Sequence, residues 1–417
     1  MKRTVTIVSA LLVSLLFAAV LFAFIARAAV AVPFADELKF GALYAELARG
    51  GMPSLSTLMA SHNGHPYLLL NLLLALTLHF GWSWSWMMYA QVPVLVLAFW
   101  VVLRNLANST GGGAWPFVAA VGIACSLVTV RLWENLYWGM QISAALCFLF
   151  IVLCFDAAAR YLREGSGRAA ASTAAWGLLA VLSTGAGIFA ALIAAVFVAV
   201  AALRAGRRRH AWLMAGYAAI ALVLFAAANM ISGKYGVGYQ SFPWLAGIEH
   251  LLRMFAHAFL ALDPQRNGGL VLGAGVLLAA CVLLGLALRR LWKGEDYAFE
   301  CMVMLLGFAL IGSITYARTK YGIFQPTAPR YILFVVPVAI ACFMLLCRFR
   351  ARALLAAACV LVLAGTVRDA RVEWDIAPYR KVGLTGHRDA LCGPQPGEPA
   401  AAFDERTRAF LCRSAHD

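Results

Sequence analysis

Two adjacent carboxylates follow the first long apolar run of this sequence. Asp36 and Glu37 lie in the stretch FADELKF, residues 34–40, at the outer end of a segment suited to crossing a membrane. A carboxylate at the boundary between lipid and water can act as a general base and take the proton of a sugar hydroxyl. Acids there also suit the first turn of a surface helix, because they favour the helix dipole. These two residues alone leave both interpretations open.

A pair of histidines stands slightly later in the chain. His62 and His65 bracket Asn63 within SHNGHPY, residues 61–67, directly before a short apolar segment. Imidazoles at that place can donate hydrogen bonds to a phosphate, bind a metal ion or cap the following helix. Two histidines do not identify a metal site, so a divalent ion stays possible without being required.

A third polar stretch, RLWENLYWGMQ, covers residues 131–141. Its aromatic side chains suit the interfacial belt of a membrane protein. Its hydrogen-bonding groups exceed what a belt requires, and aromatic faces beside such groups also suit a sugar. The candidate sugar or acceptor ligands, together with His62 and Asn63, are Arg131, Trp133, Glu134, Asn135 and Gln141.

The most basic outer stretch is YARTKYGIFQPTAPRY, residues 316–331. Arg318, Lys320 and Arg330 are predicted to face outward, against the usual trend that places positive loops inside. Snorkelling from the ends of spans explains one such cation, whereas three favour an anionic partner such as a lipid-linked phosphate. With Tyr331 and His65, these cations form the predicted phosphate-binding set.

The composition determines where these polar groups must stand. Of the 417 residues, 63% are hydrophobic and only 13% are charged, and the mean hydropathy is +0.82. This predicts an all-α polytopic membrane protein. The net charge of +15 lies in short loops between apolar runs, so it indicates topology and no nucleic-acid partner.

Basic residues mark one side of the membrane in five clusters. They occur at residues 2–3, 160–168, 204–209, 289–293 and 348–352, and the apolar runs between clusters must cross in even numbers. Eleven spans satisfy this rule, with a cytoplasmic N-terminus and an outer tail. The predicted spans are residues 5–30, 84–104, 115–131, 138–156, 170–184, 186–204, 211–231, 268–290, 297–316, 330–347 and 352–367.

The apolar stretch at residues 67–80 is the exception. At about 14 residues it is short for a span, and a crossing there would put the Arg160 cluster outside. Pro66 suits the first turn of a helix. We therefore predict a helix on the outer surface, within a first outer loop of about residues 33–83.

The two ends of the chain carry further expectations. Lys2, Arg3 and the stretch ARAAVA suit a cleaved signal peptide, but the apolar run of over 20 residues exceeds the usual 7–15 and favours an uncleaved anchor. Residues 1–367 form the predicted membrane domain, and residues 368–417 form a small outer tail. Cys392 and Cys412 in that tail could form a disulfide.

One polar segment is assigned no chemistry. Glu249, His250, Arg253 and His257 share roughly one face of a predicted helix. An amphipathic helix on the membrane surface accounts for that pattern.

In their order along the chain, these motifs resemble the GT-C superfamily of membrane glycosyltransferases, which includes protein O-mannosyltransferases and lipid A aminoarabinose transferases. ADE, at residues 35–37, stands at the family's acidic motif, and GHPYLLLNLLLALTLHFGWS, from Gly64 to Ser83, is similar to the segment that opens its surface helix. HNGH, RLWENLYWGMQ and PRY (Pro329–Tyr331) resemble motifs of a bacterial branch.

The resemblance covers about the first 145 residues and is patchy afterwards. Gly64 replaces an acid of that branch and Pro66 stands where a Pro pair is common, which leaves a family-like metal site open.

The resemblance implies a sugar donor linked to polyprenyl phosphate. Transfer would go to a lipid, glycan or protein acceptor at the outer, periplasmic face of the bacterial inner membrane. Asp36 would deprotonate the acceptor hydroxyl, with Glu37 orienting or substituting for it. The basic set, with His65, would stabilise the charge that develops on the leaving phosphate.

A transporter or a flippase for lipid-linked sugars is the alternative function. Such a protein is expected to place ionisable residues near the middle of its spans, often in broken helices repeated across two halves. The predicted spans are almost free of such charges, and the sequence shows no repeat. These features favour the enzyme.

Overall fold

The structure, a computed structural model, describes residues 2–33, 35–62, 65–231, 242–260, 268–322, 328–393 and 403–413. The first eight helices are α1 (Lys2–Ala28), α2 (Gly41–Ala48), α3 (Leu55–Leu58), α4 (Leu68–His79), α5 (Ser85–Thr110), α6 (Ala114–Leu127), α7 (Trp133–Tyr137) and α8 (Ile142–Glu164). The others are α9 (Gly167–Ser183), α10 (Gly187–Arg204), α11 (Arg208–Ile231), α12 (Trp244–His257), α13 (Gly268–Trp292), α14 (Ala298–Arg318), α15 (Ile332–Arg348), α16 (Arg352–Cys392) and α17 (Glu405–Arg413).

Short elements connect these helices at one end of the bundle. The 3-10 turns there are η1 (Ala35–Phe40), η2 (Val130–Leu132), η3 (Gly139–Gln141), η4 (Thr319–Tyr321) and η6 (Pro329–Tyr331). In the described ranges, the strands β1 (Ser61–His62) and β2 (His65–Pro66) form one antiparallel hairpin, with His62 opposite His65.

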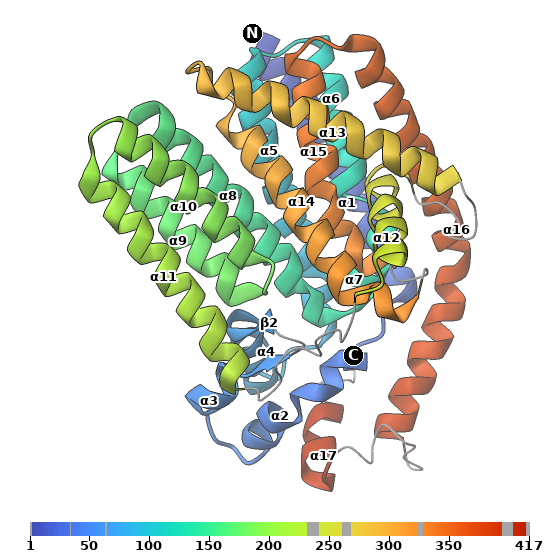
Figure 1. The fold of residues 1–417 in the computed structure, drawn as a ribbon. Helices are drawn as coiled ribbons and strands as arrows, with labels where there is room; N and C mark the ends of the chain where they lie inside the picture. The colour runs from blue at the N-terminus through green and yellow to red at the C-terminus, as the bar shows by residue number, and fades with distance from the viewer. Residues whose placement is uncertain are drawn as a thin grey trace.

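The long helices confirm a multi-pass membrane protein. Within the described residues, ten helices are long and apolar enough to cross a membrane. The eleventh predicted span, residues 170–184, falls on α9, which has 17 residues and packs against α8 and α10. Figure 1 shows α8, α9, α10 and α11 side by side as one bundle, next to a second body that contains α5, α6, α14 and α15.

The basic clusters gather at one end of the molecule. In Figure 1 the N-terminus and the turns between α8 and α9, α10 and α11, and α15 and α16 lie at the top, opposite α17. Contacts join these clusters: Arg163 pairs with Asp296 at 3.2 Å, and Arg204 lies 3.9 Å from the ring centroid of Trp292. This distribution agrees with an odd number of crossings. Which end faces the cytoplasm stays a prediction.

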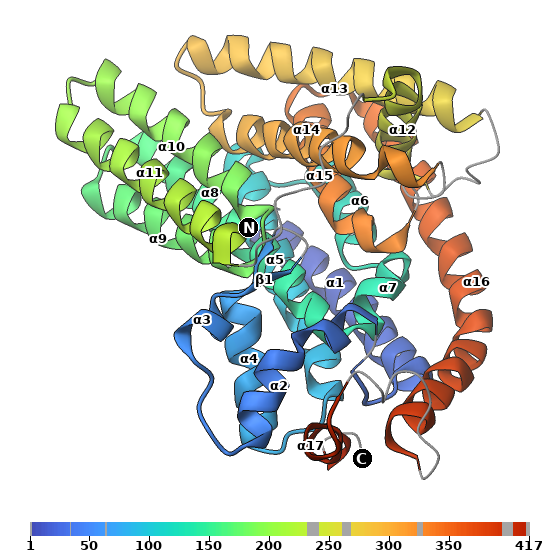
Figure 2. The ribbon, with the colours of Figure 1, turned by 60° about the horizontal axis from the view of Figure 1, so that its bottom comes forward.

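The predicted surface helix exists and is too short to cross. α4 has 12 residues, about 18 Å of helix, against a hydrocarbon core of about 30 Å. Leu70 and Leu74 are fully buried, whereas Leu72 and Leu76 are 38% and 43% exposed. Together with α2 and α3, α4 forms a cap beside the loop end of the bundle (Figure 2).

The tight contact between α9 and α10 requires a glycine. A Cβ atom on Gly187 would lie 2.1 Å from the carbonyl carbon of Ala180, so no larger residue fits without moving the backbone. Close approach through small residues is a common way to pack membrane helices. It brings the turn at residues 184–186 to the loop end of the bundle, beside β2.

The last helix continues far beyond its predicted end. α16 has 41 residues, about 60 Å of helix, and its second half is polar. Arg131 pairs with Asp369 at 3.2 Å, and Arg380 lies 3.2 Å from the ring centroid of Trp133. These contacts hold the polar half against the bundle, and the tail has more helix than the sequence led us to expect. The predicted disulfide between Cys392 and Cys412 is present and joins α16 to α17.

α12 differs from the expectation in the direction of its polar face. His250, Arg253 and His257 are buried against the protein, and the aromatic and aliphatic side chains of Trp244 and Leu245 are 73% and 86% exposed. The helix is amphipathic as predicted, but it presents its apolar side outward. A helix that borders lipid instead of water would have this arrangement.

Candidate functional site

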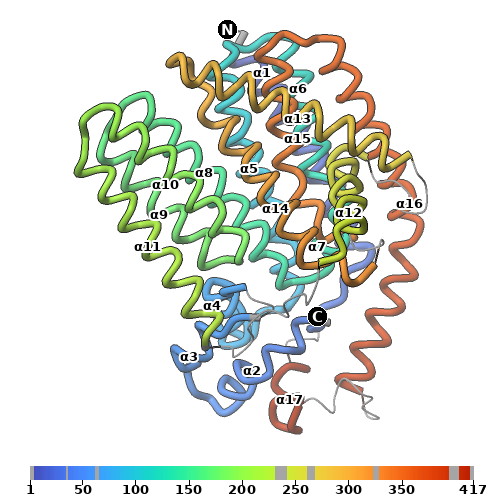
Figure 3. The backbone as a smooth tube through the Cα atoms, viewed as in Figure 1, coloured from blue at the N-terminus to red at the C-terminus, as the bar shows by residue number. Residues whose placement is uncertain are grey.

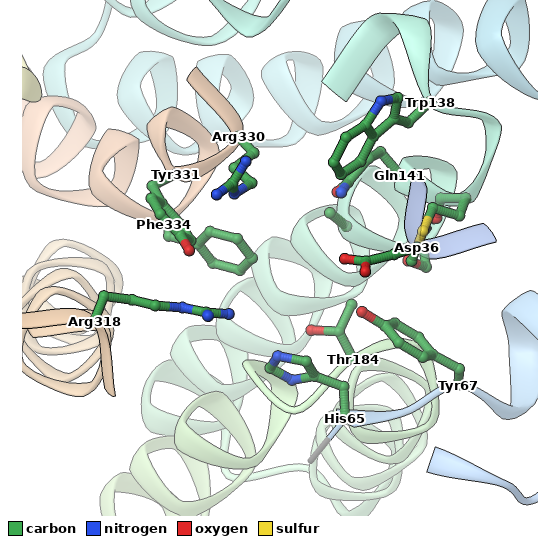
Figure 4. A pocket seen from close by; sticks show the side chains of 13 residues that line it. Asp36, His65, Tyr67, Trp138, Gln141, Thr184, Arg318, Arg330, Tyr331 and Phe334 are labelled. Atoms are coloured by element: carbon green, nitrogen blue, oxygen red, sulfur yellow. Dashed lines mark hydrogen bonds between the residues drawn. The ribbon is translucent and has the colours of Figure 1, made fainter. Parts of the chain in front are cut away.

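A pocket opens at the loop end of the bundle, where segments far apart in the sequence meet. It encloses about 570 Å³, counting its open mouth. Figure 4 shows the side chains that converge on it from η1, β2, η3, α14 and η6. The residues that line it are Asp36, His65, Tyr67, Trp138, Met140, Gln141, Ser143, Ala144, Thr184, Arg318, Arg330, Tyr331 and Phe334.

Asp36 is the carboxylate of this pocket. It belongs to η1, and its side chain is 33% exposed and pairs with Lys39 Nζ at 2.7 Å. Such a partly exposed pair contributes little to stability, because solvent screens it. The carboxylate of Asp36 points into the pocket from the side opposite Arg318 (Figure 4).

Glu37 has a different position from its neighbour. Its side chain is fully buried and does not line the pocket. Oε1 accepts a hydrogen bond from the backbone N–H of Met140 at 2.6 Å, and Oε2 accepts one from Trp84 Nε1 at 3.2 Å. The Tyr44 hydroxyl donates to the Glu37 carbonyl at 2.8 Å. Glu37 therefore joins η1 to η3 and to Trp84, the residue before α5, and so holds Asp36 in place.

Two guanidinium groups face the pocket. Arg318, at the end of α14, reaches in from one side, 5.9 Å from the ring centroid of Tyr331. Arg330 enters from η6, where it forms an ion pair with Glu134. The third predicted cation, Lys320, does not line the pocket and lies 5.1 Å from the ring centroid of Tyr321.

The stretch at residues 131–141 supports the basic segment. Glu134 Oε2 accepts the backbone N–H of Arg330 at 3.2 Å, and Asn135 Nδ2 donates to the Arg330 carbonyl at 3.5 Å. Asn135 Nδ2 also donates to Gln141 Oε1 at 3.4 Å, and Gln141 lines the pocket. Glu134 and Asn135, predicted as sugar ligands, thus hold Arg330 and Gln141 in position.

Arg131 and Trp133 point to another part of the molecule. Arg131 is buried, pairs with Asp369 and donates to the backbone carbonyl of His257 at 2.7 Å. Trp133 lies under Arg380 of α16. Neither side chain lines the pocket, so the structure gives both a role in fixing α16.

His65 is oriented by the turn between α9 and α10. The backbone N–H of Gly185 donates to His65 Nδ1 at 3.2 Å. Nδ1 is therefore an acceptor, and the ring proton belongs on Nε2. An Nε2–H in this pocket is a hydrogen-bond donor suited to an oxygen ligand. His62 pairs with His65 in the hairpin, and Asn63 lies outside the described residues.

Several lining residues were not among the predicted set. Tyr67 is the last residue of SHNGHPY. Burial raises the pKa of its hydroxyl, and the negative charge of Asp36 adds a smaller effect in the same direction. It therefore stays protonated and can donate a hydrogen bond at neutral pH. Thr184 belongs to the stretch LSTGAGIF, whose glycines indicate a tight turn. Trp138 and Phe334 are aromatic residues at span ends, where an interfacial position gives no separate signal.

The arrangement can bind an anion and accept a proton within one space. Arg318, Arg330 and His65 supply donors, and Asp36 supplies a basic carboxylate. Among the described residues, no group of three or more histidine, cysteine, aspartate or glutamate side chains could hold a metal ion.

Comparison with known proteins gave no match to a family model, to a curated protein or to a solved structure.

Proposed function

We propose that this protein is a membrane glycosyltransferase that moves a sugar from a polyprenyl-phosphate donor to a hydroxyl of a cell-envelope acceptor. The acceptor would be a glycolipid, a polysaccharide or a protein at the outer face of a bacterial inner membrane. The observation that carries the proposal is the pocket in which the Asp36 carboxylate stands opposite the guanidinium groups of Arg318 and Arg330.

The charges of the pocket suit both halves of such a transfer. Asp36 takes the proton of the acceptor hydroxyl while that oxygen forms a bond to the anomeric carbon of the sugar. The bond between this carbon and the phosphate oxygen breaks, and its electron pair leaves with the lipid phosphate. Arg318 and Arg330 stabilise the negative charge that develops there. A single displacement of this kind inverts the configuration at the anomeric carbon.

The neutral donors of the pocket suit a sugar. His65, Tyr67 and Gln141 offer hydrogen-bonding groups, and Trp138 and Phe334 offer apolar faces. A sugar ring uses both, since its hydroxyls form hydrogen bonds while its C–H face packs on an aromatic ring. The donor phosphate would lie on the arginine side and the acceptor hydroxyl beside Asp36.

The test begins with a strain that lacks the gene. Mass spectrometry of its lipids and polysaccharides should show one missing glycosyl unit, and the wild-type gene should restore it. The Arg318→Ala gene should fail to restore the unit at an equal level of membrane protein. The Lys320→Ala gene is the matched control, because Lys320 is a cation near the same helix end that does not line the pocket. An unchanged glycan profile in the deletion strain would refute the proposal.

A further inference from the structure

A second concave surface lies at the basic end of the molecule, between the α8–α11 bundle and the helices that follow it. This groove encloses about 1680 Å³, counting the open space along it. Its lining residues come mainly from α10 and α13, with others from the end of α8 and from the turn before α14. Figure 3 shows the backbone of these helices. The residues that matter here are Arg163, Val196, Val200, Arg204, Leu288 and Trp292.

The walls of the groove are apolar and exposed. Val196 and Val200 on α10 are 59% and 44% exposed, and Leu288 on α13 is 39% exposed. α10 and α13 are both long and apolar enough to span a membrane, so these side chains are expected to face hydrocarbon. From Val196 to Ala205 the groove follows α10 for about 14 Å, close to the roughly 15 Å of hydrocarbon in one leaflet. Acyl chains of a single leaflet match this depth and polarity.

The mouth of the groove carries a cation at the level where headgroups begin. Arg204 ends α10, and its guanidinium lies 3.9 Å from the ring centroid of Trp292 on the opposite wall. Both acids at the mouth already have arginine partners, since Asp296 pairs with Arg163 at 3.2 Å and Glu295 with Arg290 at 3.1 Å. A tryptophan and an arginine at the end of an apolar groove form a typical boundary between acyl chain and phosphate.

The surrounding charge selects the sign of the headgroup. The chain segments that contribute Arg163, Arg204 and Asp296 to the groove are residues 160–168, 204–209 and 289–296, and they contain ten basic and three acidic side chains. The basic ones are Arg160, Arg163, Arg168, Arg204, Arg207, Arg208, Arg209, Arg289, Arg290 and Lys293. Basic pockets between membrane helices favour anionic lipid headgroups.

We propose that this groove is a binding site for an anionic phospholipid, whose acyl chains lie between α10 and α13 and whose phosphate meets Arg204. The site is separate from the pocket around Asp36, at the opposite end of the bundle. The lipid would fill the space between the two helical bodies at their basic ends, and α14 contacts both α8 and α10.

The experiment measures lipid binding by the full chain. Purified protein is depleted of lipid and titrated with dioleoyl phosphatidylglycerol or dioleoyl phosphatidylcholine, which share acyl chains and differ in charge. Native mass spectrometry counts the bound lipid. The phosphatidylglycerol should bind to the wild type at one saturable site, about tenfold or more tighter than the phosphatidylcholine, because one charge-assisted contact is worth at least that factor.

Two variants and one control locate the site. Arg204→Gln should abolish the preference for the anionic lipid, and Val200→Trp should reduce binding of both lipids by filling the groove. Arg209→Gln removes an equal charge from the first turn of α11, at a residue that does not line the groove, and should leave the preference within about twofold of the wild type. If Arg204→Gln does not fold, the saturable preference of the wild type and the effect of Val200→Trp still decide the question.

Three results would overturn the inference. One is equal binding of the two lipids to the wild type. The second is an equal loss of preference in Arg204→Gln and Arg209→Gln, which would indicate a diffuse electrostatic effect. The third is unchanged binding in Val200→Trp.

Discussion

Glu134 holds both the backbone and the side chain of Arg330, across 196 positions of sequence. One carboxylate oxygen accepts the backbone N–H of Arg330 at 3.2 Å, and the other pairs with its guanidinium. Most ion pairs leave the backbone of the cation free to move. Here the same group fixes the start of η6 and the direction of the arginine that faces the pocket.

Replacing Glu134 should therefore affect the donor side of the pocket. We expect Glu134→Gln to raise the KM for the donor about tenfold or more, because the guanidinium loses its charged partner. The double variant with Arg330→Gln should be little worse than Arg330→Gln alone, since both changes break one pair. Glu249→Gln is the control, because it breaks the 2.7 Å pair with Arg253 outside the pocket. Additive effects of Glu134→Gln and Arg330→Gln would contradict the coupling.

Asp36→Asn should remove the base and retain the fold. Asparagine keeps the size of the side chain and its hydrogen bonding but cannot take a proton. We expect transfer to fall by about 10²–10⁴, the usual contribution of general-base catalysis, while the melting temperature stays near that of the wild type. The matched control is Asp375→Asn, on the exposed surface of α16. Native transfer rates in Asp36→Asn protein would exclude Asp36 as the base.

Glu37→Gln should have the opposite profile. The buried carboxylate accepts from two N–H donors, and a glutamine directs its amide nitrogen at one of them. A buried donor without an acceptor costs about 1–3 kcal/mol, so we expect a clear drop in melting temperature. Thermal unfolding in detergent measures it, and Asp36→Asn serves as the comparison. A fully stable but inactive Glu37→Gln protein would instead assign the base to Glu37.

The buried histidines of α12 make stability depend on pH. Burial lowers the pKa of His250 to about 4 and that of His257 to about 3, the latter with a smaller effect of Arg131. In the unfolded chain both titrate near pH 6.5, so below that pH the unfolded state binds more protons than the folded state. Stability should be full above pH 6.5 and should fall towards pH 4 by about 1.4 kcal/mol per pH unit for each histidine.

Melting curves between pH 7.5 and pH 4.5 check this expectation. His250→Gln should lower stability at pH 7.5 but flatten its decline in acid, because one of the two titrating groups is gone. His79→Gln changes a histidine at the end of α4, away from α12, and should leave the decline unchanged. A wild-type melting temperature that does not change over this range would show that the buried rings do not govern stability.

The tail should loosen when its disulfide is removed. Cys392 and Cys412 are 20 residues apart, and closing a loop of that length stabilises a fold by about 3 kcal/mol in the chain-entropy model. Cys412→Ser should release α17 from α2, where Arg406 Nε donates to the Ala48 carbonyl at 3.0 Å. Limited proteolysis should then cut residues 393–413 faster. Cys281→Ser, at an exposed free cysteine, is the control. Equal cleavage rates would show that the bridge does not hold the tail.

The helices were predictable because the bilayer imposes their length and the positive loops impose their direction. The short α4 followed from the same argument, whereas α9, predicted as a span, has 17 residues and is not among the ten described helices long and apolar enough to cross. The end of α16 did not, because the residues after Val367 show no clear period. That helix is held by contacts with Arg131 and Trp133, more than 230 positions earlier in the chain.

The site was predictable in part, for a physical reason. Asp36, Arg318 and Arg330 are charged residues at the ends of apolar runs. A charged side chain near hydrocarbon costs enough free energy to suggest that it has a function. Which of two adjacent acids faces the pocket depends on the turn of η1, which no sequence pattern specified. The support of Arg330 by Glu134 is a contact over 196 positions, and sequence alone could not pair them.

Because α4 has an outward apolar face, we expect the position of the Asp36 pocket along the membrane normal to depend on the thickness of the surrounding bilayer. Leu72 and Leu76 need hydrocarbon beside them, while the long helices to which the cap is joined need a core of matching depth. A thicker or thinner bilayer satisfies one of these demands at the expense of the other, which is hydrophobic mismatch. We therefore expect the lipid composition of a reconstituted membrane to change the vertical position of α4 and of the hairpin that carries His65, and with it the shape of this pocket.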